Sequence, residues 1–283
     1  MTVPALRNAI KSLLTRAGVE NPDGDAAEIL CAALNCSRTE LILRDDELSD
    51  VESEKAVAMA RRRAAGEPIQ YVLGYWFFMD RKYTVGEGVL IPRDDTEVVV
   101  REALAIVKAI PRPVIVDLCS GSGIIAITLE KELEHATVYA VEKSELAFSY
   151  LRENIELHQA DVEAICADLA DCAGDFADGS LDMIISNPPY IRSDEIATLQ
   201  REVQYEPRLA LDGGENGYDF YEMIISLWTK KLKEGGTIAF EIGEGQFSYI
   251  AELLKAAGYT DIKGTKDIQG TVRAITAQKG SLS

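Results

Sequence analysis

After Pro92 the sequence alternates between short apolar segments and amphipathic segments with helical spacing, and this alternation constrains the fold more than any other feature. The apolar segments with strand character are residues 114–117, 137–141, 162–166, 181–186 and 236–242. Buried strands that alternate with helices form a mainly parallel sheet that helices cover on both faces. Residues 260–264 and 271–277 follow without a helix between them, so we expect an antiparallel pair to end this α/β sheet.

The first 70 residues show helical patterns only. Ser37 with Glu40, and Ser49 with Glu52, have the spacing of a capping box, in which the two side chains satisfy backbone N–H groups at a helix start. Residues 70–91 then combine aromatic, β-branched and glycine residues, which is typical of a hairpin. We therefore predict a helical bundle at 1–72, a β-hairpin linker at 73–92 and an α/β domain at 93–283.

Charge and composition exclude several classes of protein. The 283 residues carry a formal net charge of −18, which argues against binding nucleic acid mainly through phosphate contacts, and no direct nucleic-acid partner is expected. No apolar run reaches the roughly 20 residues that cross a bilayer, and the N-terminus lacks the pattern of a signal peptide. Five cysteines without a C-x-x-C pair favour a cytoplasmic protein, and two isolated histidines favour neither a metal site nor a histidine triad.

A glycine-containing loop follows the first strand of the α/β part, where nucleotide-like ligands bind in doubly wound sheets. Its candidate cofactor-binding residues are Asp117, Cys119, Ser120, Gly121, Ser122 and Gly123. The loop lacks the G-x-G-x-x-G dinucleotide fingerprint, and its acidic first residue would repel a pyrophosphate. A cofactor without phosphates is therefore favoured.

Two further acidic residues stand at the ends of the next strands. Glu142 can accept hydrogen bonds from both ribose hydroxyls, and Asp168 can meet an adenine amino group. Acidic groups at three successive strand ends suit S-adenosylmethionine, which has a cationic sulfonium and free ribose hydroxyls. The alternative is that the glycines only form a tight turn and that the acids are solvated loop residues.

The segment Asn187-Pro188-Pro189-Tyr190 follows the fourth strand and is the candidate reacting end. The two prolines hold the backbone rigid. The Asn187 side-chain oxygen and the Pro188 carbonyl are two acceptors for the protons of a planar NH₂ group, and Tyr190 offers an aromatic face. Holding both N–H bonds can aim a poorly nucleophilic nitrogen at a methyl group. The alternative is a rigid loop whose tyrosine packs on a neighbour.

These motifs, in this order, resemble class I S-adenosylmethionine-dependent methyltransferases that methylate amino groups. Nearly the whole chain resembles the release factor glutamine methyltransferases, the PrmC/HemK family. The further matching stretches are Gly66 to Gly74, Leu90-Ile-Pro-Arg93 with Thr96-Glu97, Tyr205 to Gly214 with Gly217, Glu241-Ile-Gly243 with Gln246, and Asp267 with Gly270 and Arg273. The sequence departs from the family pattern at Asp94, usually proline, at Cys119, more often glycine, and at Glu142, more often aspartate.

The resemblance implies a seven-stranded Rossmann-like methyltransferase sheet behind a helical, substrate-recognising N-terminal domain. It implies methylation of the glutamine amide in the Gly-Gly-Gln motif of peptide chain release factors, with S-adenosylhomocysteine as the second product and no metal. Asn187, Pro188, Pro189 and Tyr190 would bind the substrate amide, and Asn187 would also border the cofactor. The alternatives are a glutamine methyltransferase for a ribosomal protein, a DNA or RNA amino-methyltransferase, and a non-catalytic cofactor-binding module.

Overall fold

The computed structural model describes residues 1–280, which form two compact units. The helical unit contains Met1–Trp76, Val85–Glu87 and Gln200–Tyr205. Of the described residues, the sheet unit contains Phe77–Thr84, Gly88–Leu199 and 206–280. Within the described residues, no helix is both long enough and apolar enough to span a bilayer.

The helical unit packs its helices around one apolar core. The helices are α1 (Val3–Arg16), α2 (Pro22–Leu34), α3 (Arg38–Leu43), α4 (Asp50–Ala64) and α5 (Ile69–Leu73). Both expected capping boxes are present, at Ser37 with Glu40 and at Ser49 with Glu52. The core includes Leu6, Leu14 and Leu30, all buried.

A buried arginine connects α4 to the short segment of residues 200–205 in the helical unit. Arg63 donates through Nε to Asp25 Oδ2 at 2.6 Å and through Nη2 to Glu202 Oε1 at 2.5 Å. Arg63 is only 4% exposed, so these two carboxylates compensate a charge that water does not reach. The segment is therefore held to the bundle by its ion pair with Arg63.

The hairpin starts later than its sequence pattern predicts. Residues 69–73 form α5 instead of the start of a strand, and the two-stranded sheet consists of β1 (Tyr75–Phe78) and β2 (Arg81–Thr84). Pro68 precedes the helix and Gly74 ends it with a φ of 81°, a left-handed conformation that favours glycine. The aromatic and β-branched residues before Gly74 thus pack as one helical turn.

The sheet unit contains the predicted seven-stranded sheet, with the strand order β5-β4-β3-β6-β7-β9-β8. The strands are β3 (Val114–Leu118), β4 (Thr137–Glu142), β5 (Val162–Cys166), β6 (Leu181–Ser186), β7 (Leu232–Glu241), β8 (Tyr259–Lys266) and β9 (Val272–Lys279). Strands β3 to β7 pair in parallel, and β9 pairs antiparallel with both β7 and β8. The predicted fold class, including the antiparallel pair at the end, is confirmed.

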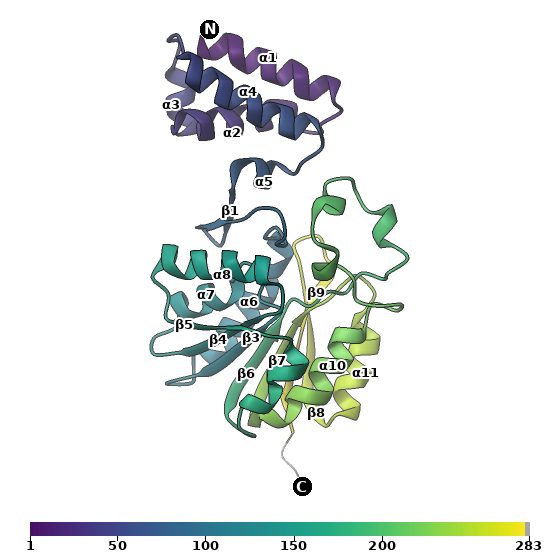
Figure 1. The fold of residues 1–283 in the computed structure, drawn as a ribbon. Coiled ribbons are helices and arrows are strands. Elements are labelled where there is room, and N and C mark those ends of the chain that lie inside the picture. Colours follow the sequence, from purple (N-terminus) through teal and green to yellow (C-terminus); the bar gives the residue numbers. More distant parts are fainter. Residues whose placement is uncertain (281–283) are drawn as a thin grey trace. The chain divides into compact units, whose positions relative to one another are not determined.

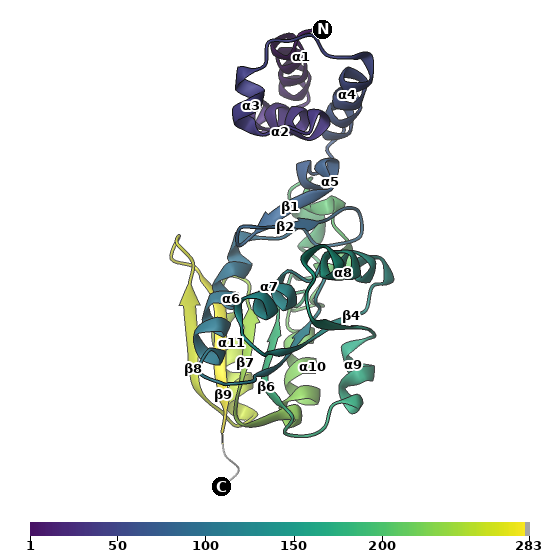
Figure 2. The same ribbon diagram turned by 90° about the vertical axis from the view of Figure 1, so that its left-hand side faces the viewer.

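Helices cover both faces of this sheet (Figures 1 and 2). The helices α6 (Asp94–Val107), α7 (Ile124–Glu132) and α8 (Glu145–His158) share one core with the sheet residues Ile115 and Ile185. The other core contains Val116 and Ile184, together with residues of α9 (Leu169–Cys172), α10 (Asp219–Trp228) and α11 (Phe247–Ala256). Successive residues of one strand therefore face opposite cores, as strand geometry requires.

Two element boundaries differ from the sequence expectation. The amphipathic pattern of residues 97–110 predicts a helix there, but helix α6 begins three residues earlier and covers Asp94–Val107. Its first turn holds the acidic residues Asp94 and Asp95, whose negative charges are stabilised at the positive end of the helix dipole. Strand β7 begins at Leu232 instead of residue 236, although charged and glycine residues at 233–236 give little strand signal. The irregular pairing between β6 and β7 falls at this same end.

Candidate active site

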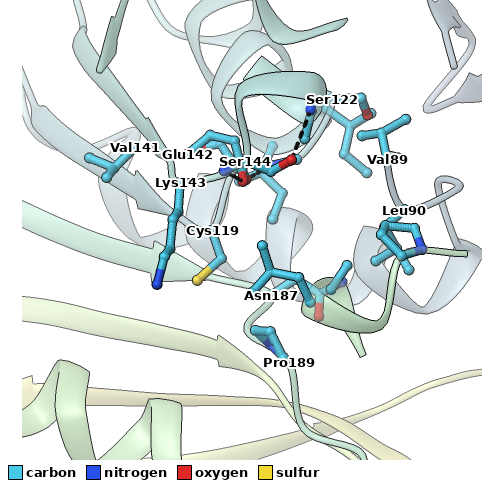
Figure 3. Close-up of a pocket in the computed structure, with 18 of the residues that line it drawn as sticks. Val89, Leu90, Cys119, Ser122, Val141, Glu142, Lys143, Ser144, Asn187 and Pro189 are labelled. Carbon is cyan, nitrogen blue, oxygen red and sulfur yellow. Dashed lines mark hydrogen bonds between the residues drawn. The ribbon is translucent and has the colours of Figure 1, made fainter. Parts of the chain in front are cut away.

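One cavity lies at the carboxyl ends of β3, β4, β5 and β6. Figure 3 shows labelled side chains from three of these strand ends around it: Cys119 and Ser122 after β3, Glu142 at the end of β4, and Asn187 after β6. In the sheet, β4 and β5 extend from β3 toward one edge, whereas β6 and the later strands extend toward the other edge, so the strand order reverses between β3 and β6. Doubly wound sheets bind ligands at such a switch point. The topology thus brings together residues that are far apart in the sequence.

The loop after β3 has three residues in the left-handed conformation. Cys119, Gly121 and Gly123 have φ angles of 61°, 55° and 84°. Cys119 therefore adopts a conformation that costs about 1–2 kcal/mol for a residue with a Cβ atom, a cost that glycine would avoid. At Gly123 a Cβ atom would lie 2.4 Å from Leu151 Cδ1 of α8, so this glycine allows close packing.

Asp117 and Gly123 do not line the cavity, whereas Cys119, Ser120, Gly121 and Ser122 do. Asp117 is fully buried, and its Oδ2 accepts a hydrogen bond from the Ala126 N–H of α7 at 3.2 Å. Its Oδ1 has no hydrogen-bond partner among the described residues, and burial raises the pKa of this carboxyl group to about 8. Asp117 thus joins the loop to the start of α7.

Glu142 points its carboxylate at the loop after β3. Its Oε2 accepts from the Gly121 N–H at 2.8 Å and its Oε1 from the Ser144 N–H at 2.7 Å. Burial raises the pKa of Glu142, and the backbone N–H groups oppose that shift. Each carboxylate oxygen can accept more than one hydrogen bond, so this fixed carboxylate can still bind two hydroxyl groups.

Asp168 is held differently. Its Oδ1 accepts from the Ala170 N–H at 2.9 Å at the start of α9, and its Oδ2 forms an ion pair with Lys143 Nζ at 2.7 Å. The hydrogen bond from Lys143 lowers the pKa of Asp168, so the group is a carboxylate at neutral pH. Both predicted acids line the same cavity.

The donor set of the cavity fits a cofactor that has hydroxyl and amino groups and no phosphate. Its two basic side chains are already paired, Lys143 with Asp168 and Arg93 with Glu206. Apolar residues form much of the remaining wall, among them Val89, Ile91, Ile125, Leu169, Phe220 and Met223. This combination can hold the adenosine part of S-adenosylmethionine.

Asn187 lines the same cavity as these acids and belongs to a chain of hydrogen bonds. Its Nδ2 donates to Thr96 Oγ1 at 3.2 Å, and Thr96 Oγ1 donates to Glu241 Oε2 at 2.6 Å. Tyr190 donates its hydroxyl to Glu241 Oε1 at 3.3 Å. Thr96 and Glu241 are each 1% exposed, and burial raises the pKa of Glu241 to about 7.

The four residues of the motif after β6 take three different positions. Asn187 and Pro189 line the cavity of Figure 3, whereas Pro188 is buried outside its wall. Tyr190 lines a second cavity, together with residues such as Tyr218 and Gln246. Tyr190 thus lies outside the wall of the first cavity, and its hydroxyl group donates to Glu241.

Glu206 joins two stretches that the sequence presents as unrelated. Its Oε2 accepts from the Ile91 N–H at 2.9 Å, and its Oε1 forms an ion pair with Arg93. These two contacts of Glu206 attach the segment 88–93, which lines the cavity, to the loop that follows the Asn187 segment. Arg93 is also the residue just before α6, and Asp94, the first residue of that helix, does not line the cavity.

Sequence reasoning missed several residues around the cavity. Phe220 and Met223 of α10 line it, but their spacing is that of any helix packed on a sheet. Thr96 and Glu241 stand in matching stretches of the sequence without an evident role, and only the fold brings them to Asn187. Within the described residues, histidine, cysteine and carboxylate side chains form no group of three that could hold a metal ion.

The chain matches two family models. The PrmC N-terminal domain matches residues 5–74, and the Methyltransferase small domain matches residues 102–239. A release factor glutamine methyltransferase of Geobacter sulfurreducens is 37% identical over 281 residues, covering 99% of this chain and 97% of the relative. A release factor glutamine methyltransferase of Thermodesulfovibrio yellowstonii is 36% identical over 258 residues, covering 90% and 92%.

Solved structures resemble the chain in fold. The catalytic domain of hMettl16, in complex with MAT2A 3'UTR hairpin 1, superposes with a TM-score of 0.56 at 13% identity. The superposition covers 84% of this chain and 85% of that one. At this level of identity the likeness concerns the arrangement of helices and strands.

Proposed function

This chain belongs to the release factor glutamine methyltransferase family, and from that premise we propose that it methylates the side-chain amide nitrogen of the glutamine in the Gly-Gly-Gln motif of peptide chain release factors. The observation that carries this proposal is that Asn187 lines the same cavity as Glu142 and Asp168. One cavity thus has the side-chain oxygen of Asn187 as an acceptor for an amide beside acceptors for an adenosine. The cytoplasm, where release factors act, is the proposed place of the reaction.

S-adenosylmethionine is the proposed cofactor, and when bound it supplies an electrophilic methyl group on a cationic sulfur. Glu142 would hold the ribose hydroxyls, since its carboxylate is already fixed by two backbone N–H groups. Asp168 would meet the adenine amino group at the same wall. The cavity-lining residues of the loop after β3 would contact the cofactor; these are Cys119, Ser120, Gly121 and Ser122. Asp117 and Gly123 would instead maintain the conformation of that loop.

The glutamine amide is a poor nucleophile because its nitrogen lone pair is delocalised into the carbonyl group. We propose that the Asn187 side-chain oxygen and the Pro188 carbonyl oxygen accept its two N–H groups, so that the nitrogen faces the methyl group. Such orientation and electrostatic support are the main sources of rate in this scheme. Pro189 and Tyr190 would keep the two acceptors rigid.

Methyl transfer forms one nitrogen–carbon bond and breaks one sulfur–carbon bond. The positive charge leaves with an amide proton, which passes to solvent. The products are N5-methylglutamine and S-adenosylhomocysteine. No strong general base is needed, because the amide nitrogen becomes acidic as the new bond forms.

The helical unit is proposed to recognise the folded release factor, and the sheet unit is proposed to carry out the methyl transfer. The matched N-terminal family model coincides with the helices α1 to α5. The net charge of −18 favours a partner with a basic surface. In this proposal, recognition belongs to the helical unit and catalysis to the sheet unit.

The test incubates the protein with methyl-labelled S-adenosylmethionine and, separately, purified release factor, ribosomal protein and DNA. A release factor whose motif glutamine is replaced by glutamate is the matched control, because it keeps the shape and removes the NH₂ group. Label on the wild-type release factor and none on the control supports the proposal. Label only on ribosomal protein or DNA, or cofactor binding with no label on any acceptor, would overturn it.

A further inference from the structure

We propose that Thr96 and Glu241 are positioning residues that orient the side-chain amide of Asn187, so that its oxygen and not its nitrogen faces the substrate. The proposal rests on the methyl transfer proposed above. It concerns residues from three separate elements: Thr96 from the first turn of α6, Glu241 from the end of β7, and Asn187 from the segment after β6.

The two ends of an asparagine amide have nearly the same shape and opposite hydrogen-bonding character. The oxygen accepts, and the NH₂ group donates twice. A substrate amide nitrogen also carries two protons, so it can bind only the oxygen of Asn187. If the Asn187 amide turned by 180°, two donor groups would face each other and the substrate would be held in the wrong orientation or not at all.

Thr96 determines which end of Asn187 points away from the cavity wall. A hydroxyl group has one proton to donate, and that of Thr96 goes to Glu241 Oε2 over 2.6 Å, a short hydrogen bond to a carboxyl oxygen. Toward Asn187 the Thr96 oxygen can therefore only accept, and it lies 3.2 Å from Asn187 Nδ2. The NH₂ group is thus held by Thr96, and Oδ1 is left for the substrate.

Glu241 also fixes the far end of the same segment. Its second oxygen, Oε1, accepts from the Tyr190 hydroxyl at 3.3 Å. One buried carboxylate thereby holds two side chains on either side of the two prolines, Asn187 through Thr96 and Tyr190 directly. The arrangement combines rigid backbone between Asn187 and Tyr190 with a side-chain network that has one consistent pattern of donors and acceptors.

The charged groups around Glu241 come from neighbouring elements. Asp95 of α6 raises its pKa and Arg273 of β9 lowers it. Arg273 Nε lies 3.2 Å from Asp95 Oδ2 and 3.2 Å from Asp267 Oδ2, so this one guanidinium group forms ion pairs with both carboxylates. Thr96, Asp95, Tyr190 and Arg273 thus act on the Glu241 carboxyl group, and Arg273 is itself paired with Asp267.

The test compares Thr96→Val, which keeps the shape and removes the hydroxyl, with Thr96→Ser, which keeps the hydroxyl. We expect Thr96→Val to lower kcat on the release factor by about tenfold, the value of one hydrogen bond, with an unchanged Kd for S-adenosylmethionine. Thr96→Ser should restore kcat to within about twofold of wild type. Thr96→Ala, with less bulk, serves as the second hydroxyl-free variant should the valine variant fold poorly.

A double-mutant cycle separates positioning from general support of the fold. If Thr96 acts through Asn187, then Thr96→Val should have no further effect on kcat in an Asn187→Ala background. Additive effects, a wild-type kcat in Thr96→Val or Thr96→Ala, or failure of Thr96→Ser to restore activity would each overturn the proposal. Failure of the proposed function looks different, because the wild-type protein itself would then not label the release factor.

Discussion

The two ends of the cavity are built by different kinds of contact. At the cofactor end, Glu142 and Asp168 are fixed by backbone N–H groups, those of Gly121, Ser144 and Ala170. Two of these contacts span only two residues of sequence, and the third joins neighbouring strand ends 21 residues apart. The cofactor end is therefore shaped mainly by its own backbone.

At the reacting end, side chains hold other side chains across long stretches of sequence. Asn187 and Thr96 are 91 residues apart, and Thr96 and Glu241 are 145 apart. Each side chain has its donor and acceptor roles set by the next. From this difference we expect substitutions at the cofactor end to change mainly the Kd for S-adenosylmethionine, and substitutions at the reacting end to change mainly kcat.

The largest effect is expected from Asn187→Ala. The change removes the proposed acceptor for the substrate amide, and loss of one preoriented polar partner at a reacting group costs roughly 10²- to 10³-fold in kcat. The Kd for S-adenosylmethionine should stay close to wild type, because Glu142 and Asp168 remain. Single-turnover labelling of the release factor gives the first quantity and titration calorimetry the second.

Gln269→Ala is the matched control for Asn187→Ala, since it removes an exposed amide in the turn between β8 and β9. It should leave both quantities unchanged. A variant of Asn187 that turns over normally but binds the cofactor weakly would reverse the assignment of the two ends.

The next largest effect is expected from Glu142→Ala. Loss of charge-assisted hydrogen bonds to the ribose should raise the Kd for S-adenosylmethionine by roughly 10- to 100-fold, at about 1.5–3 kcal/mol for a hydrogen bond to a charged group. Turnover at saturating cofactor should change much less. Calorimetry and kinetics at several cofactor concentrations measure the two effects.

Glu163→Ala, an exposed glutamate in the middle of β5, is the control for Glu142→Ala. It should bind the cofactor as wild type does. An unchanged Kd in Glu142→Ala would remove the ribose role from this residue. A melting curve of each variant checks that the Gly121 loop still folds, because Glu142 also accepts a hydrogen bond from that loop.

The same difference explains how much the sequence could predict. The strand pattern, the glycine turn and the two acids at strand ends are local signals, and they led to the confirmed fold class and to residues that line one cavity. The sequence could not separate Gly121 from Gly123, because only the packing of Leu151 shows that the second glycine faces a helix. Nor could it connect Thr96 with Glu241, since that contact depends on where β7 ends beside α6.

The smallest effect is expected from pH, and it concerns the reacting end alone. Glu241 has a pKa raised from 4.5 to about 7, mainly by burial, with Asp95 adding to the shift and Thr96, Tyr190 and Arg273 opposing it. Only the carboxylate form requires the Thr96 proton, so kcat should rise by up to about tenfold as pH increases through about 7. In Thr96→Val this rise in kcat should largely disappear, because the variant lacks the hydroxyl group that links the ionisation of Glu241 to the orientation of Asn187.

Stability should change with pH in the opposite direction. Because the folded state holds the Glu241 proton at pH values where the unfolded chain has released it, the free energy of unfolding should fall as pH rises from about 4.5 to about 7. Glu241→Gln removes this contribution, while Asp117, with a pKa of about 8, continues to contribute in both proteins. The difference between the wild-type and Glu241→Gln denaturation curves across this range therefore isolates Glu241. A wild-type kcat that is flat where this difference is large would show that ionisation of Glu241 does not orient Asn187, leaving only the Thr96 hydroxyl to do so.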